Sequence, residues 1–170
     1  MRLHDAMAVL LAIAIGAACA ERRTEVRPAP PPAGTVLLKA PAPPPDAPTV
    51  VVDDLEGEGI DDLGRCAAQV GLGVAQSGRA HVVLRSEIAA QMKECIDVDC
   101  QQRVSAPLLA ARYVVHGSAN RLGDGYVVHL KLLQPDGAAV LARITRQGPG
   151  DLQVLLFEAG REVGEALPVK

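Results

Sequence analysis

The order of secondary structure is set first by residues 49–84, TVVVDDLEGEGIDDLGRCAAQVGLGVAQSGRAHVVL. The β-branched run Thr49-Val50-Val51-Val52 is typical of a buried strand. Apolar residues then recur three and four positions apart, which is the spacing of one helix face. These residues are Ile60, Leu63, Ala67, Val70 and Val74. Ser77-Gly78 should end the helix and His81–Leu84 should form a second strand, so this stretch predicts a right-handed parallel crossover.

The expected helix contains two features that need a physical reason. Asp61 and Asp62 fall in its first turn, where the helix dipole favours negative charge. Gly64, Gly71 and Gly73 fall inside the helix and weaken it. We expect these glycines to allow close packing of the helix on the sheet.

Two further helices are expected after the second strand. Ser86 should cap the first of them. Its inner face would be apolar, namely Ile88, Met92 and Ile96 or Cys95. Asp99-x-x-Gln102 resembles a capping box and should start the other helix. Pro107 should break or restart that helix, with Ser105 as a new cap.

Three strands should follow as an antiparallel meander. Their expected ranges are Tyr113–Ser118, Tyr126–Leu133 and Ala138–Arg146. The last two runs alternate in polarity, and turn signals at Asn120–Gly125 and Gln134–Gly137 separate the three.

A last helix completes the expected fold. Asp151 should cap it. Its inward residues would be Leu152, Leu155, Leu156, Ala159 and Val163. The order β-α-β-α-α-β-β-β-α predicts one α/β domain over residues 49–170, in which four helices cover a mixed sheet of about five strands.

The amino-terminal residues 1–19 have the features of a bacterial export signal. Arg2 supplies a positive charge, and Met7–Ala18 is an apolar run too short to span a membrane. Gly16-Ala17-Ala18-Cys19 resembles a lipobox, which implies cleavage before Cys19 and its lipidation. The residue after Cys19 is not Asp, which resembles the pattern of outer-membrane lipoproteins. Ordinary cleavage after Ala20 and an uncleaved anchor are the alternatives.

Residues 20–48 are expected to be a disordered tether. Nine of the thirteen prolines lie between Pro28 and Pro48. A proline-rich chain lacks amide donors and favours polyproline II. At about 3.1 Å per residue, the stretch from Pro28 to Pro48 reaches roughly 65 Å and suits a spacer that holds a domain away from a membrane.

The cysteines are the most informative residues of the domain. Export permits disulfides. Cys19 is assigned to the lipid, and Cys66 flanks the apolar face of the first helix as a small buried side chain. Cys95 and Cys100 are left at the junction of two helices, and we expect a disulfide between them.

No catalytic, cofactor or metal site is expected. A zinc site needs about four ligands, and the sequence has neither a second Cys pair beside Cys95 and Cys100 nor a His pair at helical spacing. The acidic run from Asp53 to Asp62 only faintly resembles a calcium loop, because Arg65 stands where a bidentate Glu is required. Gly57-Glu58-Gly59 lacks the third glycine of a dinucleotide fingerprint. No nucleophile has a base at a recognisable spacing.

Nucleic-acid binding is also not expected. The net charge of the 170 residues is −3, and the chain has two Tyr, one Phe and no Trp. Such a chain lacks both a basic stripe and the aromatic platforms on which bases stack.

Several segments in order resemble the TolB amino-terminal-like and CsgG-like domains of Gram-negative envelope proteins. The matching segments are Val51–Gly59, His81–Ile88, Cys95–Cys100, Ala111–Ser118 and Leu122–Val128. Ser105-Ala106-Pro107 departs from the pattern, because such domains usually continue a helix there. The chain also lacks the long inserted strands with which CsgG-like pores span a membrane. The resemblance implies a non-enzymatic domain used for protein interaction or assembly.

The expected function is therefore that of an envelope lipoprotein module with a protein partner, on the periplasmic face of the outer membrane or secreted to the periplasm. A subunit of an oligomeric outer-membrane secretion or assembly complex is one alternative. A periplasmic hydrolase that uses His116 or His129 with the acidic loop is the other.

Overall fold

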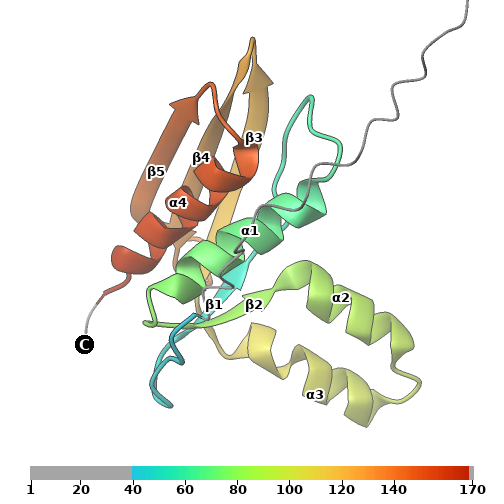
Figure 1. The fold of residues 1–170 in the computed structure, drawn as a ribbon. Helices are drawn as coiled ribbons and strands as arrows, with labels where there is room; N and C mark the ends of the chain where they lie inside the picture. The colour runs from blue at the N-terminus through green and yellow to red at the C-terminus, as the bar shows by residue number, and fades with distance from the viewer. Residues whose placement is uncertain (1–39, 169–170) are drawn as a thin grey trace, which may run out of the picture. The chain divides into compact units, whose positions relative to one another are not determined.

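The computed structural model describes residues 40–168. The expected signal, the expected lipidation site Cys19 and the expected tether up to residue 39 lie outside the described residues. The elements are β1 (Thr49–Val52), α1 (Leu63–Gln76), β2 (His81–Leu84), α2 (Arg85–Glu94), α3 (Val98–Leu109), β3 (Ala111–Leu122), β4 (Gly125–Leu133), β5 (Val140–Gly148) and α4 (Leu152–Glu165) (Figure 1). This order confirms the predicted fold class.

One mixed sheet runs through the domain in the order β2-β1-β3-β4-β5. β1 is parallel to both β2 and β3, whereas β3, β4 and β5 pair antiparallel. The predicted parallel crossover and carboxyl-terminal meander are both confirmed.

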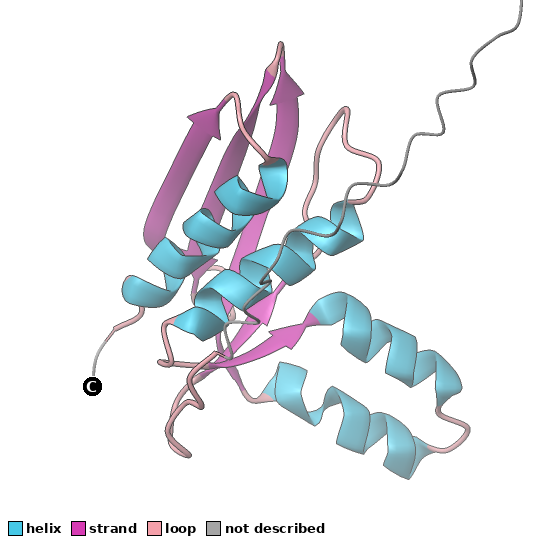
Figure 2. Ribbon diagram, viewed as in Figure 1, coloured by secondary structure: helices cyan, strands magenta, loops and turns pink. Residues whose placement is uncertain are grey.

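Helices α1 and α4 lie side by side over one face of the sheet (Figure 2). Strand residues that point toward these helices are buried, whereas their neighbours on the strand point away. The core side chains with an exposed fraction of at most 1% include Val50, Val52, Val115, Leu130, Leu132, Val70, Val74, Leu156 and Val163. Burial of this aliphatic layer is the main term that stabilises the fold.

Glycines set the distance between α1 and α4. A Cβ atom on Gly73 would lie 2.2 Å from the carbonyl oxygen of Phe157, and one on Gly160 would lie 2.2 Å from that of Val70. The expectation that the α1 glycines serve packing on the sheet is correct for Gly71, whose Cβ would meet Leu84 of β2. It is wrong for Gly73, which faces α4.

The helix starts differ from the expected ones. α1 begins at Leu63, because the carboxylate of Asp62 accepts a hydrogen bond from the amide of Arg65 and caps the helix from outside. Asp61 therefore also lies outside the helix. α2 begins at Arg85 with no side-chain cap, so the expected cap at Ser86 is wrong.

The third helix also departs from expectation. Asp97, not Asp99, caps α3, and its carboxylate accepts from the amide of Cys100 at 2.6 Å. Pro107 lies within α3 and does not end it. The helix continues because only one amide donor is lost, and the amide of Ala110 again donates to Ala106 at 2.9 Å.

The strand β3 is longer than expected. Asn120 and Arg121 pair with Val127 and Tyr126, so the turn contains only Gly123 and Asp124. Gly123 has φ +59°, the left-handed conformation that a two-residue hairpin requires. The hairpin at Gln134–Gly137 is as predicted, with the amide of Gly137 donating to Gln134.

The end of the expected tether contacts the domain. The carbonyl of Pro48 accepts from the amide of His81, and the carbonyl of Pro44 lies 3.1 Å from His81 Nε2. These bonds add one rung to the β1–β2 ladder, so ordered chain begins before Thr49. Within residues 40–168, no helix is long and apolar enough to cross a bilayer.

Candidate functional sites

Helices α2 and α3 form a hairpin that stands apart from the α1–α4 layer (Figure 1). Ile88 is the only buried residue of α2, and α3 has none. The expected inner face of α2 is therefore wrong beyond Ile88, because Met92 is 37% exposed and Ile96 is fully exposed. The hairpin leaves the sheet at the edge strand β2, so only its base reaches buried side chains.

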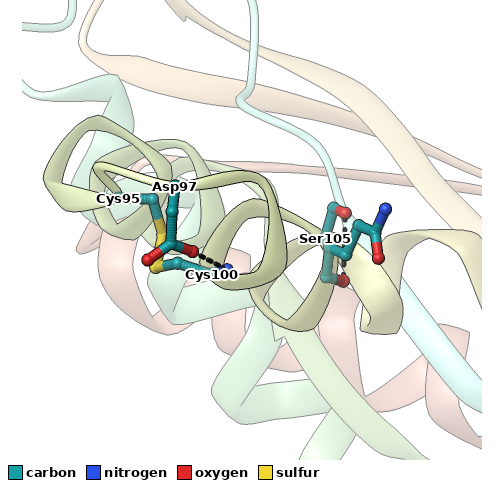
Figure 3. Close-up of a disulfide and its surroundings, with 5 residues drawn as sticks. Cys95, Asp97, Cys100 and Ser105 are labelled. Atoms are coloured by element: carbon teal, nitrogen blue, oxygen red, sulfur yellow. Dashed lines mark hydrogen bonds between the residues drawn. A yellow bond between two sulfur atoms is a disulfide. The ribbon is translucent and has the colours of Figure 1, made fainter.

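A disulfide between Cys95 and Cys100 closes the tip of this hairpin (Figure 3). The two Cα atoms are 5.4 Å apart, within the range that a disulfide needs. The bridge joins the end of α2 to the first turn of α3, where Asp97 caps the helix. Two apolar side chains inside the closed loop are exposed, Ile96 fully and Val98 by 65%.

The sulfur of Cys66 has a different environment. Its side chain lies in the core with no exposed area, as expected from its position on α1. Burial, and secondly the charge of Asp62, raises the pKa of this thiol above its usual range.

The face of the sheet opposite α1 and α4 carries polar side chains. His129, Lys131, Arg143 and Thr145 all lie exposed on β4 and β5. They line a shallow pocket of about 320 Å³, together with Glu56 and His116. His116 and His129, which are 13 positions apart in the sequence, thus share one pocket.

The acidic loop contributes to this region at one end. Asp53 follows β1 and pairs with Arg85 at 2.5 Å, and its other oxygen lies 3.7 Å from His116 Nδ1. The hydrolase alternative therefore has its acidic residue and histidine close together. Among the described residues, no hydroxyl is hydrogen-bonded to His116, and the hydroxyl bonded to His129 is that of Thr145.

The rest of the loop has a structural role. The backbone of Glu56 pairs with β3, donating to Gly117 and accepting from Ala119. A Cβ atom on Gly57 would lie 1.8 Å from the carbonyl oxygen of Ala119, so glycine is required for this close approach. In residues 40–168, no group of three or more His, Cys, Asp or Glu side chains is placed to hold a metal ion.

Sequence reasoning missed Lys131 and Arg143 as site residues. Their alternation with the core positions Leu132 and Ile144 does place them on the outer face of the sheet. Their pairing could not be foreseen, because it depends on the register between β4 and β5.

The described residues define a two-layer α/β domain with helices on one face of a mixed sheet. No protein-family model matches the chain, and no curated protein matches it.

Solved structures of similar fold come from bacterial proteins. The PelC dodecamer from Paraburkholderia phytofirmans is 19% identical with a TM-score of 0.46, over 77% of this chain and 96% of PelC. TolB from Acinetobacter baumannii is 22% identical with a TM-score of 0.45, over 75% of this chain and only 29% of TolB. Lipoprotein GNA1162 from Neisseria meningitidis is 10% identical with a TM-score of 0.43, over 71% and 99% of the two chains.

At these identities and TM-scores the likeness carries no conclusion about function. TolB, to whose amino-terminal-like domains the sequence shows a resemblance, is among these structures. The CsgG-like part of that resemblance stays a prediction.

Proposed function

We propose that this chain is a non-enzymatic, lipid-anchored module of the bacterial envelope that binds a protein partner through the tip of the α2–α3 hairpin. The observation that carries the proposal is the exposure of Ile96 and Val98 inside a disulfide-closed loop. Apolar side chains fully exposed on a projecting element gain free energy when a partner buries them. The disulfide and the Asp97 cap hold the tip in shape, which lowers the entropy lost on binding.

The amino-terminal segments support the envelope location. Cys19 would hold the chain on the periplasmic face of the outer membrane. The spacer of residues 20–39 would let the domain stand up to about 60 Å from the lipid, at about 3.1 Å per residue. A domain on such a spacer can reach partners beyond the membrane surface.

Photo-crosslinking in intact cells tests this proposal. A photoreactive amino acid at position 96 should give a discrete adduct with another protein, whereas the same group at position 109 should not. Leu109 is a suitable control because it is 85% exposed and lies at the opposite end of α3. Equal adducts at both positions, or none at position 96, would contradict the proposal.

The oligomeric alternative has one observation in its favour. β5 is an edge strand of nine residues that pairs only with β4, and Val140 and Leu141 on it are 41% and 39% exposed. An open edge can pair with a second copy of the chain. Light scattering distinguishes the two functions, because a ring or filament would have a mass several times that of one chain.

The hydrolase alternative rests on the contact between Asp53 and His116 beside the pocket. It predicts ester or amide hydrolysis that is lost in His116→Ala. Hydrolysis by the purified chain that requires His116 would replace the binding proposal.

A further inference from the structure

The open face of the sheet carries a row of basic side chains. His116, Lys131 and Arg143 are direct cross-strand partners on β3, β4 and β5. Side chains in such positions have Cβ atoms about 5 Å apart, and like charges placed directly opposite each other destabilise a sheet. An anion placed between Lys131 and Arg143 would offset this repulsion.

The described part of the protein does not supply that anion. Its ion pairs are Arg85–Asp53, His116–Asp53, Arg146–Glu162 and Arg161–Glu165. In residues 40–168, no carboxylate oxygen lies within 4.0 Å of Lys131 or Arg143. Glu56 is in the pocket wall but pairs with neither cation.

A second row of polar side chains runs beside the first. Ser118, His129 and Thr145 are also cross-strand partners, and His129 Nδ1 lies 3.0 Å from the Thr145 hydroxyl oxygen. When that hydroxyl donates to Nδ1, the ring proton is on Nε2, which is then a free donor. The pocket thus combines two permanent cations with two neutral donors, the Nε2–H of His129 and the hydroxyl of Ser118.

We propose that this pocket binds a phosphate group. A phosphate carries up to two negative charges and three terminal oxygens, and so matches a guanidinium, an ammonium and a neutral donor better than a carboxylate with two oxygens. The volume of about 320 Å³ leaves room for a small organic group attached to the phosphate. Glu56 can accept a hydrogen bond from a hydroxyl of that group. The phosphate belongs either to a small soluble phosphate monoester or to the monoester headgroup of phosphatidic acid.

The test uses the exported chain carrying Cys19→Ala, so that no lipid anchor contributes to vesicle binding. Inorganic phosphate and glycerol phosphate are titrated at constant ionic strength set with chloride. The His129 ring resonances and the thermal midpoint are followed. Both should change saturably, and Arg143→Gln or Lys131→Gln should weaken binding about tenfold or more, as expected for loss of one charged hydrogen bond.

Matched controls remove the same charge elsewhere. Arg103→Gln and Lys93→Gln, at exposed positions of α3 and α2, should leave the affinity unchanged. Vesicles of phosphatidylcholine with phosphatidic acid, whose headgroup is a phosphate monoester, form a separate arm. Binding to these vesicles but not to free phosphates, lost in Arg143→Gln, identifies a headgroup site. Absence of binding in both arms, or equal weakening by pocket and control variants, would overturn the proposal.

Discussion

The packing of the two core helices depends on two glycines, because no larger side chain fits at their positions. Gly73 and Gly160 bring the backbones of α1 and α4 into contact, and a Cβ atom on either would overlap a carbonyl oxygen of the other helix. The helices must separate to accept it.

Gly73→Ala should therefore lower the free energy of unfolding by about 1–3 kcal/mol, through forced displacement of α4. Gly64→Ala is the matched control on the same helix, because its Cβ would meet only Asp62 Oδ1, at 3.5 Å. That variant should raise stability by up to about 1 kcal/mol through helix propensity. Urea unfolding measures both, and equal effects of the two variants would contradict the packing explanation.

Cys66 should make stability depend on pH. Its folded-state pKa is raised by burial, so the native state holds the proton more tightly than the unfolded chain does. The contribution of the buried thiol to the free energy of unfolding is fully present below the pKa of an unfolded cysteine, about 8.5. It is lost as the pH rises through the higher pKa that the thiol has in the folded state. Unfolding measured from pH 7 to 10 should show this decline, and Cys66→Ala should reduce it.

At the scale of the element, the α2–α3 hairpin depends on its closed tip. Denaturing alkylation without reductant should modify Cys66 but neither Cys95 nor Cys100, since these two are joined. Reduction should add two modified sites, which mass spectrometry counts. Modification of Cys95 and Cys100 before reduction would show that the chain is not oxidised there.

The structure and the sequence expectation differ in which residue caps α3. Asp97→Ala should lower helix stability by about 0.5–2 kcal/mol, because the amide of Cys100 loses its acceptor. Asp99→Ala removes only a charge from the first turn and should cost less. Hydrogen exchange of the α3 amides distinguishes the two, and a larger effect at Asp99 would support the original capping box.

The element order was predictable where periodicity and burial coincide. The prediction of α1 and α4 from the spacing of their apolar residues was correct, because both helices bury one face on the sheet. The spacing of Ile88, Met92 and Ile96 correctly predicted a helix, but it wrongly predicted that this helix face is buried. Amphipathic spacing does not reveal whether another element of the protein covers the apolar face. The pocket was missed for a similar reason. The cross-strand partners of Lys131 depend on the register between β4 and β5, and the sequence of the turn at Gln134–Gly137 does not reveal that register.

For the molecule as a whole, the proposed attachment at Cys19 would determine where the domain acts. Cys19→Ala should move the exported chain from the membrane fraction to the soluble periplasm, because two acyl chains bind a bilayer far more tightly than one surface contact does. Cell fractionation and mass spectrometry of the amino terminus provide the measurement. A free terminus at Glu21 in the wild-type chain would instead show ordinary secretion.

The packing of the last helix on the first has a consequence for biogenesis. α4 supplies the wall of the core that faces α1, yet the two helices are separated in sequence by the whole sheet meander. A nascent chain that ends before Leu152 leaves the apolar faces of α1 and the strands in water. The domain can therefore complete its core only after α4 has been synthesised, and a chain exported as we propose would stay unfolded until α4 has also crossed the membrane.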